Sequence, residues 1–428
     1  MDRQAQPQDA QEAGAYRWYV LALLALTFSL NSIDRNVLAV VLEPVKREFG
    51  ASDAAMGFLS GLAYTLTFAM ALVPAGWLVD RVDRRRLLAA ILAAWSALTA
   101  LSALARNFGS LLALRMSVGA AEAGAGPCAM SILSDYFGPR ERSTAIGIYY
   151  TSSAIGVAGS FALGGWVAAE YGWRAAFLVA GLPGLVLALV ILATLREPRR
   201  GATDGMAGAD GHAAGFGATL SFLVANRALV HVVAGMTLAA FVTLAVLAWS
   251  ASFLVRVHGL GLRDAGLAVA VATGVFQAAG TALVGHLADR FGRDSRARMA
   301  RVAAVACVAT AVSGTAMASA TSTAAALAGL FALAFTLAST IPPTFSLLLG
   351  SAAPRMRGTL LSLVLVCTNL LGGGLGPWLT GAGSDAIGGP RALAWALGAA
   401  VLVDLWAALH FELAARRFNA APAAATPA

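Results

Sequence analysis

Two apolar runs of the sequence each carry an acidic and a basic residue. Asp34 and Arg35 are adjacent inside the run 18–42, and Arg115 and Glu122 lie in a second run further along the chain. A carboxylate can take up and release a proton, and a guanidinium holds a carboxylate or phosphate through two parallel hydrogen bonds. Ionisable side chains inside membrane helices usually serve function, because their burial is costly. These residue types therefore indicate proton exchange linked to the binding of an anion.

The spacing of these charges places them at similar depths if both runs are membrane helices. At the rise of an α-helix, Asp34 and Arg35 lie about 12–14 Å, and Arg115 about 10 Å, from the outer ends of their helices. Glu122 then lies a turn or two deeper, within reach of a long Arg35 side chain. Two acids and two arginines form a neutral set, which makes their burial tolerable.

Two interpretations of this set remain open. In the first, protonation of Asp34 or Glu122 releases an arginine to hold an anion, and deprotonation returns the arginine to its carboxylate. In the second, the four charges form a static network that only braces one helix against the other. Asn31 shares a helix face with Asp34 and Arg35 by its spacing and joins the candidate site.

The whole chain has the composition of a membrane protein. Of its 428 residues, 59% are hydrophobic and 12% are charged, and the mean hydropathy is +0.74. Soluble domains carry about 25% charged residues. Apolar stretches long enough to span about 30 Å of hydrocarbon recur along the chain. We therefore expect an all-α polytopic membrane protein. The cysteines lack metal-ligand spacing, so neither a metal nor a cofactor is predicted.

The apolar runs and their breakers predict twelve transmembrane helices in two six-helix bundles. The stretch after the sixth helix is rich in Gly and Ala, as in a flexible linker. The predicted organisation is a cytoplasmic tail 1–16, a bundle 17–195, a linker 196–225, a bundle 226–413 and a tail 414–428. The predicted spans are 17–43, 54–79, 86–105, 108–133, 143–167, 174–195, 227–256, 264–288, 298–318, 322–349, 357–382 and 391–412.

The positions of the basic residues predict the orientation of the chain. The net charge is +8. If the N-terminus is cytoplasmic, 21 Lys and Arg residues lie in cytoplasmic segments and seven on the opposite side. Positively charged loops stay in the cytoplasm during membrane insertion. We therefore expect both termini to be cytoplasmic, and the basic composition does not indicate a nucleic-acid partner.

The two halves resemble each other. GWLVDRVDR (76–84) corresponds to GHLADRFGR (285–293), and PRERSTAIG (139–147) is echoed by PRMRGTLLS (354–362). Two related six-helix halves around a linker are the repeat pattern of secondary transporters.

These loops resemble the signature loop of the major facilitator superfamily. Asp83 occupies a position where many members have glycine. Further stretches are similar to the bacterial spinster-like proteins of this superfamily. They are NSIDRNVLAVVLEPVKREFGASDAAMGFLSG (31–61), DRVDRRR (80–86), RMSVGAAEAGAGPCAMSILSDYF (115–137) and GWRAAFLVAGLPG (172–184).

The resemblance implies a secondary active transporter that works by rocker-switch alternating access in a bacterial inner membrane. It implies a proton-coupled protein that moves an amphipathic anion of the lysophospholipid or sphingolipid type, with membrane lipids around a monomer. The alternative is a proton-coupled symporter of small organic anions, because the neighbouring anion:cation symporter branch shares the Asp-Arg pair. A membrane sensor or enzyme is disfavoured, since no large soluble segment and no convergent catalytic set is present.

The resemblance also implies roles for individual residues. Asp34 and Glu122 are expected to carry the coupling proton. Asp80 is expected to face the start of the eleventh helix, and Arg84 to pair with Asp135. The expected substrate-binding residues are Asn31, Arg35, Arg115, Thr340, Thr368 and Asn369. The expected cytoplasmic gate consists of Gly76, Asp80, Arg81, Arg84, Asp135, Arg142, Asp289 and Arg293.

Overall fold

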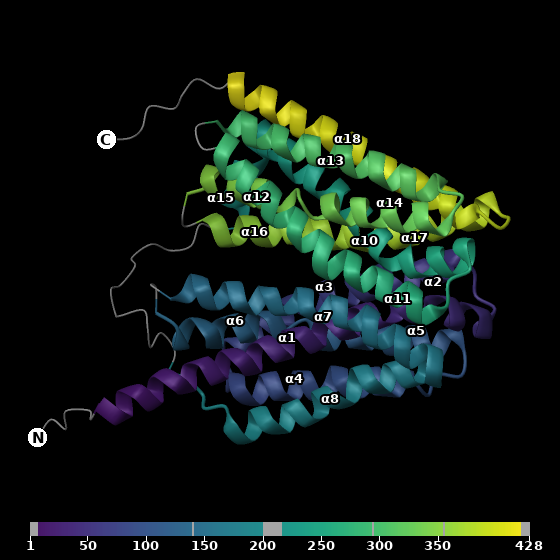
Figure 1. The fold of residues 1–428 in the computed structure, drawn as a ribbon. Coiled ribbons are helices and arrows are strands. Elements are labelled where there is room, and N and C mark those ends of the chain that lie inside the picture. Colours follow the sequence, from purple (N-terminus) through teal and green to yellow (C-terminus); the bar gives the residue numbers. More distant parts are fainter. Residues whose placement is uncertain (1–6, 139–140, 200–215, 293–294, 354–355, 421–428) are drawn as a thin grey trace, which may run out of the picture. The chain divides into compact units, whose positions relative to one another are not determined.

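The computed structural model describes residues 7–138, 141–199, 216–292, 295–353 and 356–420, and the regular structure in them is helical (Figure 1). By contacts the chain divides into two compact units. The first unit comprises 1–38 and 67–208, and the second comprises 39–66 and 209–428. The predicted bundle boundaries assigned 39–66 to the first half, whereas this segment packs with the second unit.

The first unit contains α4 (Arg84–Ser102), α5 (Phe108–Glu122), α6 (Ala125–Tyr136), α7 (Arg142–Tyr171) and α8 (Trp173–Thr194), with parts of α1 (Pro7–Phe49) and α3 (Leu62–Val79). The second unit contains the remaining parts of α1 and α3 and the following elements: α2 (Asp53–Ser60), α9 (Phe216–Ala225), α10 (Arg227–His258), α11 (Leu262–Val271), η1 (Ala272–Gln277), α12 (Ala278–Gly292), α13 (Arg296–Ser319), α14 (Thr323–Leu337), α15 (Ile341–Ser351), α16 (Arg357–Val366), η3 (Cys367–Gly374), α17 (Leu375–Ile387) and α18 (Ala392–Ala420).

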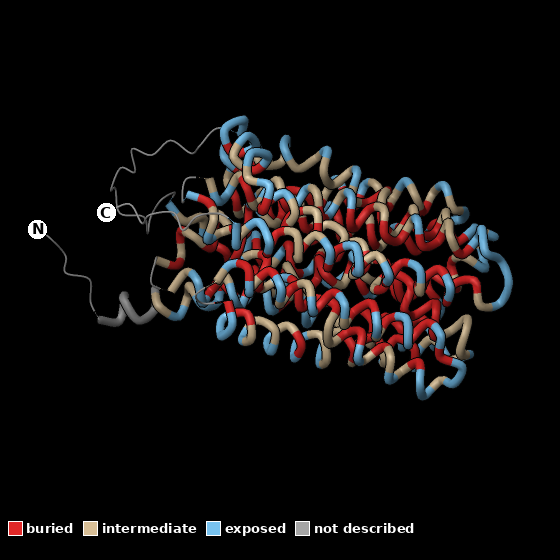
Figure 2. The backbone as a smooth tube through the Cα atoms, turned by 90° about the horizontal axis from the view of Figure 1, so that it is seen from above, coloured by how far each residue is buried: buried red, intermediate tan, exposed pale blue. Residues whose placement is uncertain are grey.

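Each predicted span falls on helical structure. Ten of the spans are long and apolar enough to cross a membrane, counted over the described residues. The helix α1 and the pair α5–α6 are not among these ten, and they carry the four charges of the candidate site. Helix α9 was not predicted as a separate element. Figure 2 shows buried, intermediate and exposed residues alternating along the helices, as expected for helices with one face packed on neighbours.

Several predicted spans are broken helices, and proline explains three of the interruptions. Pro127 lies five residues after the end of α5, Pro342 and Pro343 follow the break between α14 and α15, and Pro377 follows η3. Proline lacks the N–H that would bond to the fourth preceding carbonyl, and its ring clashes with that carbonyl. The first of these breaks comes directly after Glu122 and so ends the helix at a candidate site residue.

The helix that carries Asp34 is fixed by close contact with α7. A methyl group on Gly156 would lie 2.4 Å from the carbonyl oxygen of Ser29, so only glycine permits this approach. One turn further along α7, Ser160 donates a hydrogen bond of 3.0 Å to the carbonyl of Ile33.

Asp83, which differs from the usual glycine of the signature loop, has a local structural use. Its side chain accepts a hydrogen bond from the backbone N–H of Arg86 and caps the start of α4.

Candidate functional site

Asp34 and Arg115 form a buried ion pair. Arg115 Nη1 lies 2.7 Å from Asp34 Oδ1, and Arg115 Nη2 donates to the backbone carbonyl of Asp34 at 3.2 Å. Thr99, on α4, donates a hydrogen bond of 2.8 Å to the same carboxylate oxygen. The two charged residues are 1% and 2% exposed, respectively. Asp34 Oδ2 has no hydrogen-bond partner in the described part of the chain. The sequence placed these two charges at one depth, but did not reveal Thr99.

Arg35 and Glu122 form a second pair with a different exposure. Arg35 Nε donates to Glu122 Oε2 at 3.0 Å. The Glu122 side chain is 0% exposed, whereas the Arg35 side chain is 36% exposed. The guanidinium also lies over the ring of Phe68, 4.9 Å from the ring centre. Arg35 is therefore the more accessible arginine of the two pairs, and an anion can reach it. The Glu122 carboxylate is shielded from solvent, so a change in its charge strongly alters its interaction with Arg35.

Together the four charges make two parallel ion pairs between α1 and α5. Loss of the charge on either carboxylate would weaken its hold on the paired arginine, and an incoming anion could then bind that arginine. The same contacts also satisfy the static-brace interpretation, because buried ion pairs hold helices in register. The four charges lie close together, as predicted. Their roles in proton coupling and substrate binding remain predictions.

The other predicted substrate residues are mostly tied to their own helices. Asn31 is buried. Thr368 donates to the carbonyl of Val364, and Asn369 donates to that of Leu365 at 2.8 Å. Thr340 is buried at the start of α15. Such backbone bonds are the usual use of hydroxyl and amide groups in membrane helices. Among the three residues of the second unit, Asn369 is the exposed one.

The strongest ionic cluster among the predicted gate residues of the first unit centres on Arg84, which lies at the start of α4 and is 1% exposed. Its Nη1 lies 2.5 Å from Asp135 Oδ2, as predicted. Its Nε lies 2.7 Å from Glu197 Oε1, and its Nη2 donates to the carbonyl of Pro198. Ser131 accepts a further bond at 2.9 Å. The guanidinium thus fastens the segment after α8 onto α4 and α6, and Glu197 was not predicted.

Arg84→Ala is expected to lower the free energy of unfolding by about 3–5 kcal/mol, because it removes the buried guanidinium that pairs with Asp135 and Glu197. Thermal unfolding of the purified protein in detergent measures the change. Arg86→Gln removes an exposed arginine from the same helix and should have an effect below about 0.5 kcal/mol. Equal unfolding temperatures for the two variants would show that the Arg84 cluster contributes nothing to stability.

The other predicted gate residues have individual outcomes. Gly76 does not serve close packing in this structure, since a methyl group on it would meet nothing within 4 Å among the described residues. Asp80 and Asp289 are exposed. Arg81 stacks on Trp77 with 4.1 Å to the ring centre. Arg142 donates hydrogen bonds to the carbonyls of Ser134 and Phe137, and Arg293 lies outside the described residues. The predicted contact of Asp80 with the start of the eleventh span remains a prediction.

A second ionic cluster in the second unit was not predicted. Arg256, near the end of α10, holds Asp53 at 2.6 Å and 2.9 Å through its two Nη atoms, and holds Glu43 at 2.7 Å. Lys46 Nζ lies 2.5 Å from Asp53, and Ser384 donates to Asp53 at 2.7 Å. This Arg256 cluster fastens the segment 39–66 to α10 and α17.

The start of α2 completes the Arg256 cluster. The Asp385 carboxylate accepts the backbone N–H groups of Asp53 and Ala54 at 2.9 Å and 2.7 Å. These groups have no partner inside the helix, and an anion is favoured at a helix N-terminus. Methyl groups on Gly57 and Gly381 would lie 2.3 Å from the carbonyl oxygen of Pro377 and 2.2 Å from that of Asp53. Helix α2 therefore contacts α17 backbone to backbone.

Residues 24–377 match the Major Facilitator Superfamily, and the chain belongs to this superfamily. It is a multi-pass membrane protein and a secondary transporter, not an enzyme. The structure is similar to the crystal structure of a bacterial homolog of the human lysosomal transporter spinster, in an inward-facing and unoccupied conformation. The TM-score is 0.86 and the identity 27%, over 94% of this chain and 98% of that chain. The predicted fold and the predicted resemblance to bacterial spinster-like proteins are confirmed.

The relatives of this chain carry the names of several kinds of protein, among them an efflux pump, a spinster protein and a sugar-acid transporter. An MFS-type efflux pump of Mycolicibacterium smegmatis is 30% identical over 65% of this chain and 64% of that protein. Protein spinster of Drosophila melanogaster is 28% identical over 58% of this chain and 40% of its own length. A probable L-galactonate transporter of Escherichia coli is 29% identical over 63% of this chain and 61% of its length. Each match covers less than two thirds of the relative.

Proposed function

We propose that this chain is a proton-coupled transporter of an amphipathic, lipid-like anion such as a lysophospholipid or a sphingolipid phosphate. The observation that carries the proposal is the Arg35–Glu122 pair, in which a reachable guanidinium is held by a fully buried carboxylate. The arginine binds the anionic headgroup bidentately when Glu122 is protonated. The lipid-like substrate is what the resemblance to spinster-like proteins implies, and the similarity to the bacterial spinster homolog strengthens that resemblance.

In the proposed mechanism, alternating access of rocker-switch type exposes the site to one side of the membrane at a time. Asp34 and Glu122 carry the protons, and in their charged forms they compete with the anionic substrate for Arg115 and Arg35. The bias of basic residues supports cytoplasmic termini in a bacterial inner membrane. We further propose that the protein works as a monomer, since each unit pairs its own buried charges.

Sugar-acid transport is the second candidate function. The galactonate and hexuronate transporters among the relatives are 28–29% identical to this chain, so small carboxylates are a specific alternative. A carboxylate would use the same arginine but would need no apolar surroundings. The two candidates share the headgroup contact and differ in the substrate's tail.

Substrate-induced proton movement in proteoliposomes distinguishes these candidates. Purified full-length protein is reconstituted with a pH-sensitive dye inside, and a pH gradient is imposed. Lysophosphatidylglycerol below its micelle-forming concentration is expected to change the internal pH, and galactonate is not. Protein-free liposomes of the same composition control for leakage caused by the lysolipid. A response to galactonate alone would replace the lipid-like substrate with a sugar acid.

A further inference from the structure

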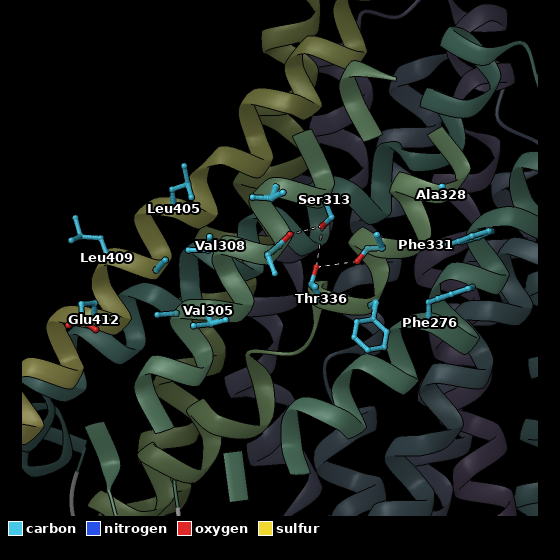
Figure 3. Close-up of a pocket in the computed structure, with 16 residues that line it drawn as sticks. Phe276, Val305, Val308, Ser313, Ala328, Phe331, Thr336, Leu405, Leu409 and Glu412 are labelled. Atoms are coloured by element: carbon cyan, nitrogen blue, oxygen red, sulfur yellow. Dashed lines mark hydrogen bonds between the residues drawn. The ribbon is translucent and has the colours of Figure 1, made fainter. Parts of the chain in front are cut away.

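A long apolar groove lies on the surface of the second unit. Its volume is about 1310 Å³. Figure 3 shows α13 along its floor, α18 as one wall, and α14 with η1 as the other. Its polar lining residues are Ser313, Thr336 and Glu412. None of the residues of the candidate transport site lines it, so it is a separate feature.

The groove is hollow because α13 presents small side chains between larger ones. Val305 and Val308 face it from the floor, and Leu405 and Leu409 rise from α18 (Figure 3). On the opposite wall, Phe276 stacks on Phe331 with 4.7 Å between ring centres. All four aliphatic side chains are exposed, so this surface lacks a covering element among the described residues. In a spanning helix bundle, such a surface contacts lipid chains.

One end of the groove carries a cluster of charges. The Glu412 carboxylate accepts from Arg301 Nε at 3.1 Å with one oxygen and from Arg416 Nε at 3.2 Å with the other. The cluster therefore has a net charge of +1. Both contacts use Nε, so the Nη atoms of two partly exposed guanidiniums are not engaged by this carboxylate. A phosphate would complement this positive end.

The length of the groove suits a lipid chain. From Arg301 to Ser313, α13 rises by about 18 Å. One leaflet of the hydrocarbon core is about 15 Å thick, half of the full span. The Ser313 and Thr336 hydroxyls bond to each other at 3.4 Å at the far end (Figure 3). The apolar part of the groove therefore matches one acyl chain that begins at the charged end.

We propose that this groove binds one anionic phospholipid of the surrounding bilayer, with an acyl chain along α13 and its phosphate held by Arg301 and Arg416. Glu412 competes with the phosphate for both arginines and so sets the affinity. The site is distinct from the transport site, and the bound lipid is a structural ligand of the second unit rather than the cargo.

Native mass spectrometry of the full-length protein tests the acyl-chain contact. Delipidated protein is titrated with dioleoyl phosphatidylglycerol or dioleoyl phosphatidylcholine. Wild-type protein is expected to retain one phosphatidylglycerol preferentially. Val308→Phe fills the floor and should remove this bound lipid. Leu402→Phe, a similar change at an exposed position of α18 outside the groove, should leave it in place.

Charge variants test the headgroup contact. Arg301→Gln should reduce the preference for phosphatidylglycerol over phosphatidylcholine about fivefold, since one basic residue near a lipid headgroup contributes an effect of this order. Glu412→Gln should increase it by a similar factor, and Glu412 is exposed enough that this variant is expected to fold. Arg86→Gln, at the cytoplasmic end of α4, should change nothing. An unchanged preference in Glu412→Gln, or full retention of lipid in folded Val308→Phe, overturns the proposal.

Discussion

Glu122→Gln is expected to abolish transport driven by a pH gradient while leaving substrate exchange intact. The amide keeps the volume of the side chain and cannot change its charge. Because the Glu122 side chain is 0% exposed and holds Arg35 at 3.0 Å, the variant permanently removes the negative charge that competes with an anion for Arg35. Proton-coupled uptake should fall to the level of protein-free liposomes. Exchange of labelled for unlabelled substrate at equal pH should continue.

Asp34→Asn is expected to lose the same coupling, with an added loss of stability. Arg115 is buried, and removing its counter-ion costs about 3–5 kcal/mol. Glu122→Gln is therefore the cleaner experiment. Its matched control is Glu141→Gln, which removes a carboxylate from another arginine pair, Arg17–Glu141, in which both side chains are partly exposed. Coupled transport at the wild-type rate in Glu122→Gln would leave only the static-brace interpretation.

The sequence revealed the buried charges because an ionised group in an apolar run is conspicuous and helical rise gives its depth. The rise per residue alone placed Asp34 at the depth of Arg115, and Glu122 within reach of Arg35. Thr99 could not be found in this way. A threonine in an apolar helix usually bonds to its own backbone, and only the packing of α4 on α1 shows that it donates to Asp34.

The partners of the arginines at the helix ends were harder to predict. Asp135 follows from the family pattern, but Glu197 lies in a polar segment after α8, where an acid is ordinary. Arg256 and Asp53 are 203 residues apart and belong to no repeated motif. Their contact depends on how α2 folds back onto α17. The prolines that mark the helix breaks are visible in the sequence. The apolar runs alone nevertheless predicted continuous spans.

Arg256→Gln is expected to release the segment 39–66 from α10 and α17. The substitution leaves Asp53 held by Lys46 and Ser384 and leaves Glu43 held by Arg47, but it removes the arginine that both carboxylates share. Removing one partner of a buried ion pair costs about 3 kcal/mol or more. An energy of this size changes the ratio of closed to open forms about 100-fold. We propose that this cluster acts as a gate that holds the segment 39–66 against α10 and α17.

Cysteine labelling measures this opening. Cys128, Cys307 and Cys367 are replaced by serine, and Met56, which is fully buried on α2, is replaced by cysteine. A membrane-impermeant maleimide should then label Met56→Cys far faster in the Arg256→Gln background. Arg47→Gln is the matched control, because Arg47 also pairs with Glu43 but is 68% exposed, and such pairs contribute about 0.3–0.5 kcal/mol.

A double substitution separates loss of the arginine from exposure of the carboxylates. Asp53→Asn in the Arg256→Gln background removes the buried carboxylate charge that has lost its arginine, while keeping the size of the side chain. If repulsion and desolvation of the carboxylates cause the opening, labelling of the cysteine at position 56 should fall back toward the wild-type rate. Labelling that stays slow in Arg256→Gln itself would mean that the glycine-mediated contact between α2 and α17 holds the segment without the ion pairs, and the gate would then be assigned to backbone packing at Gly57 and Gly381.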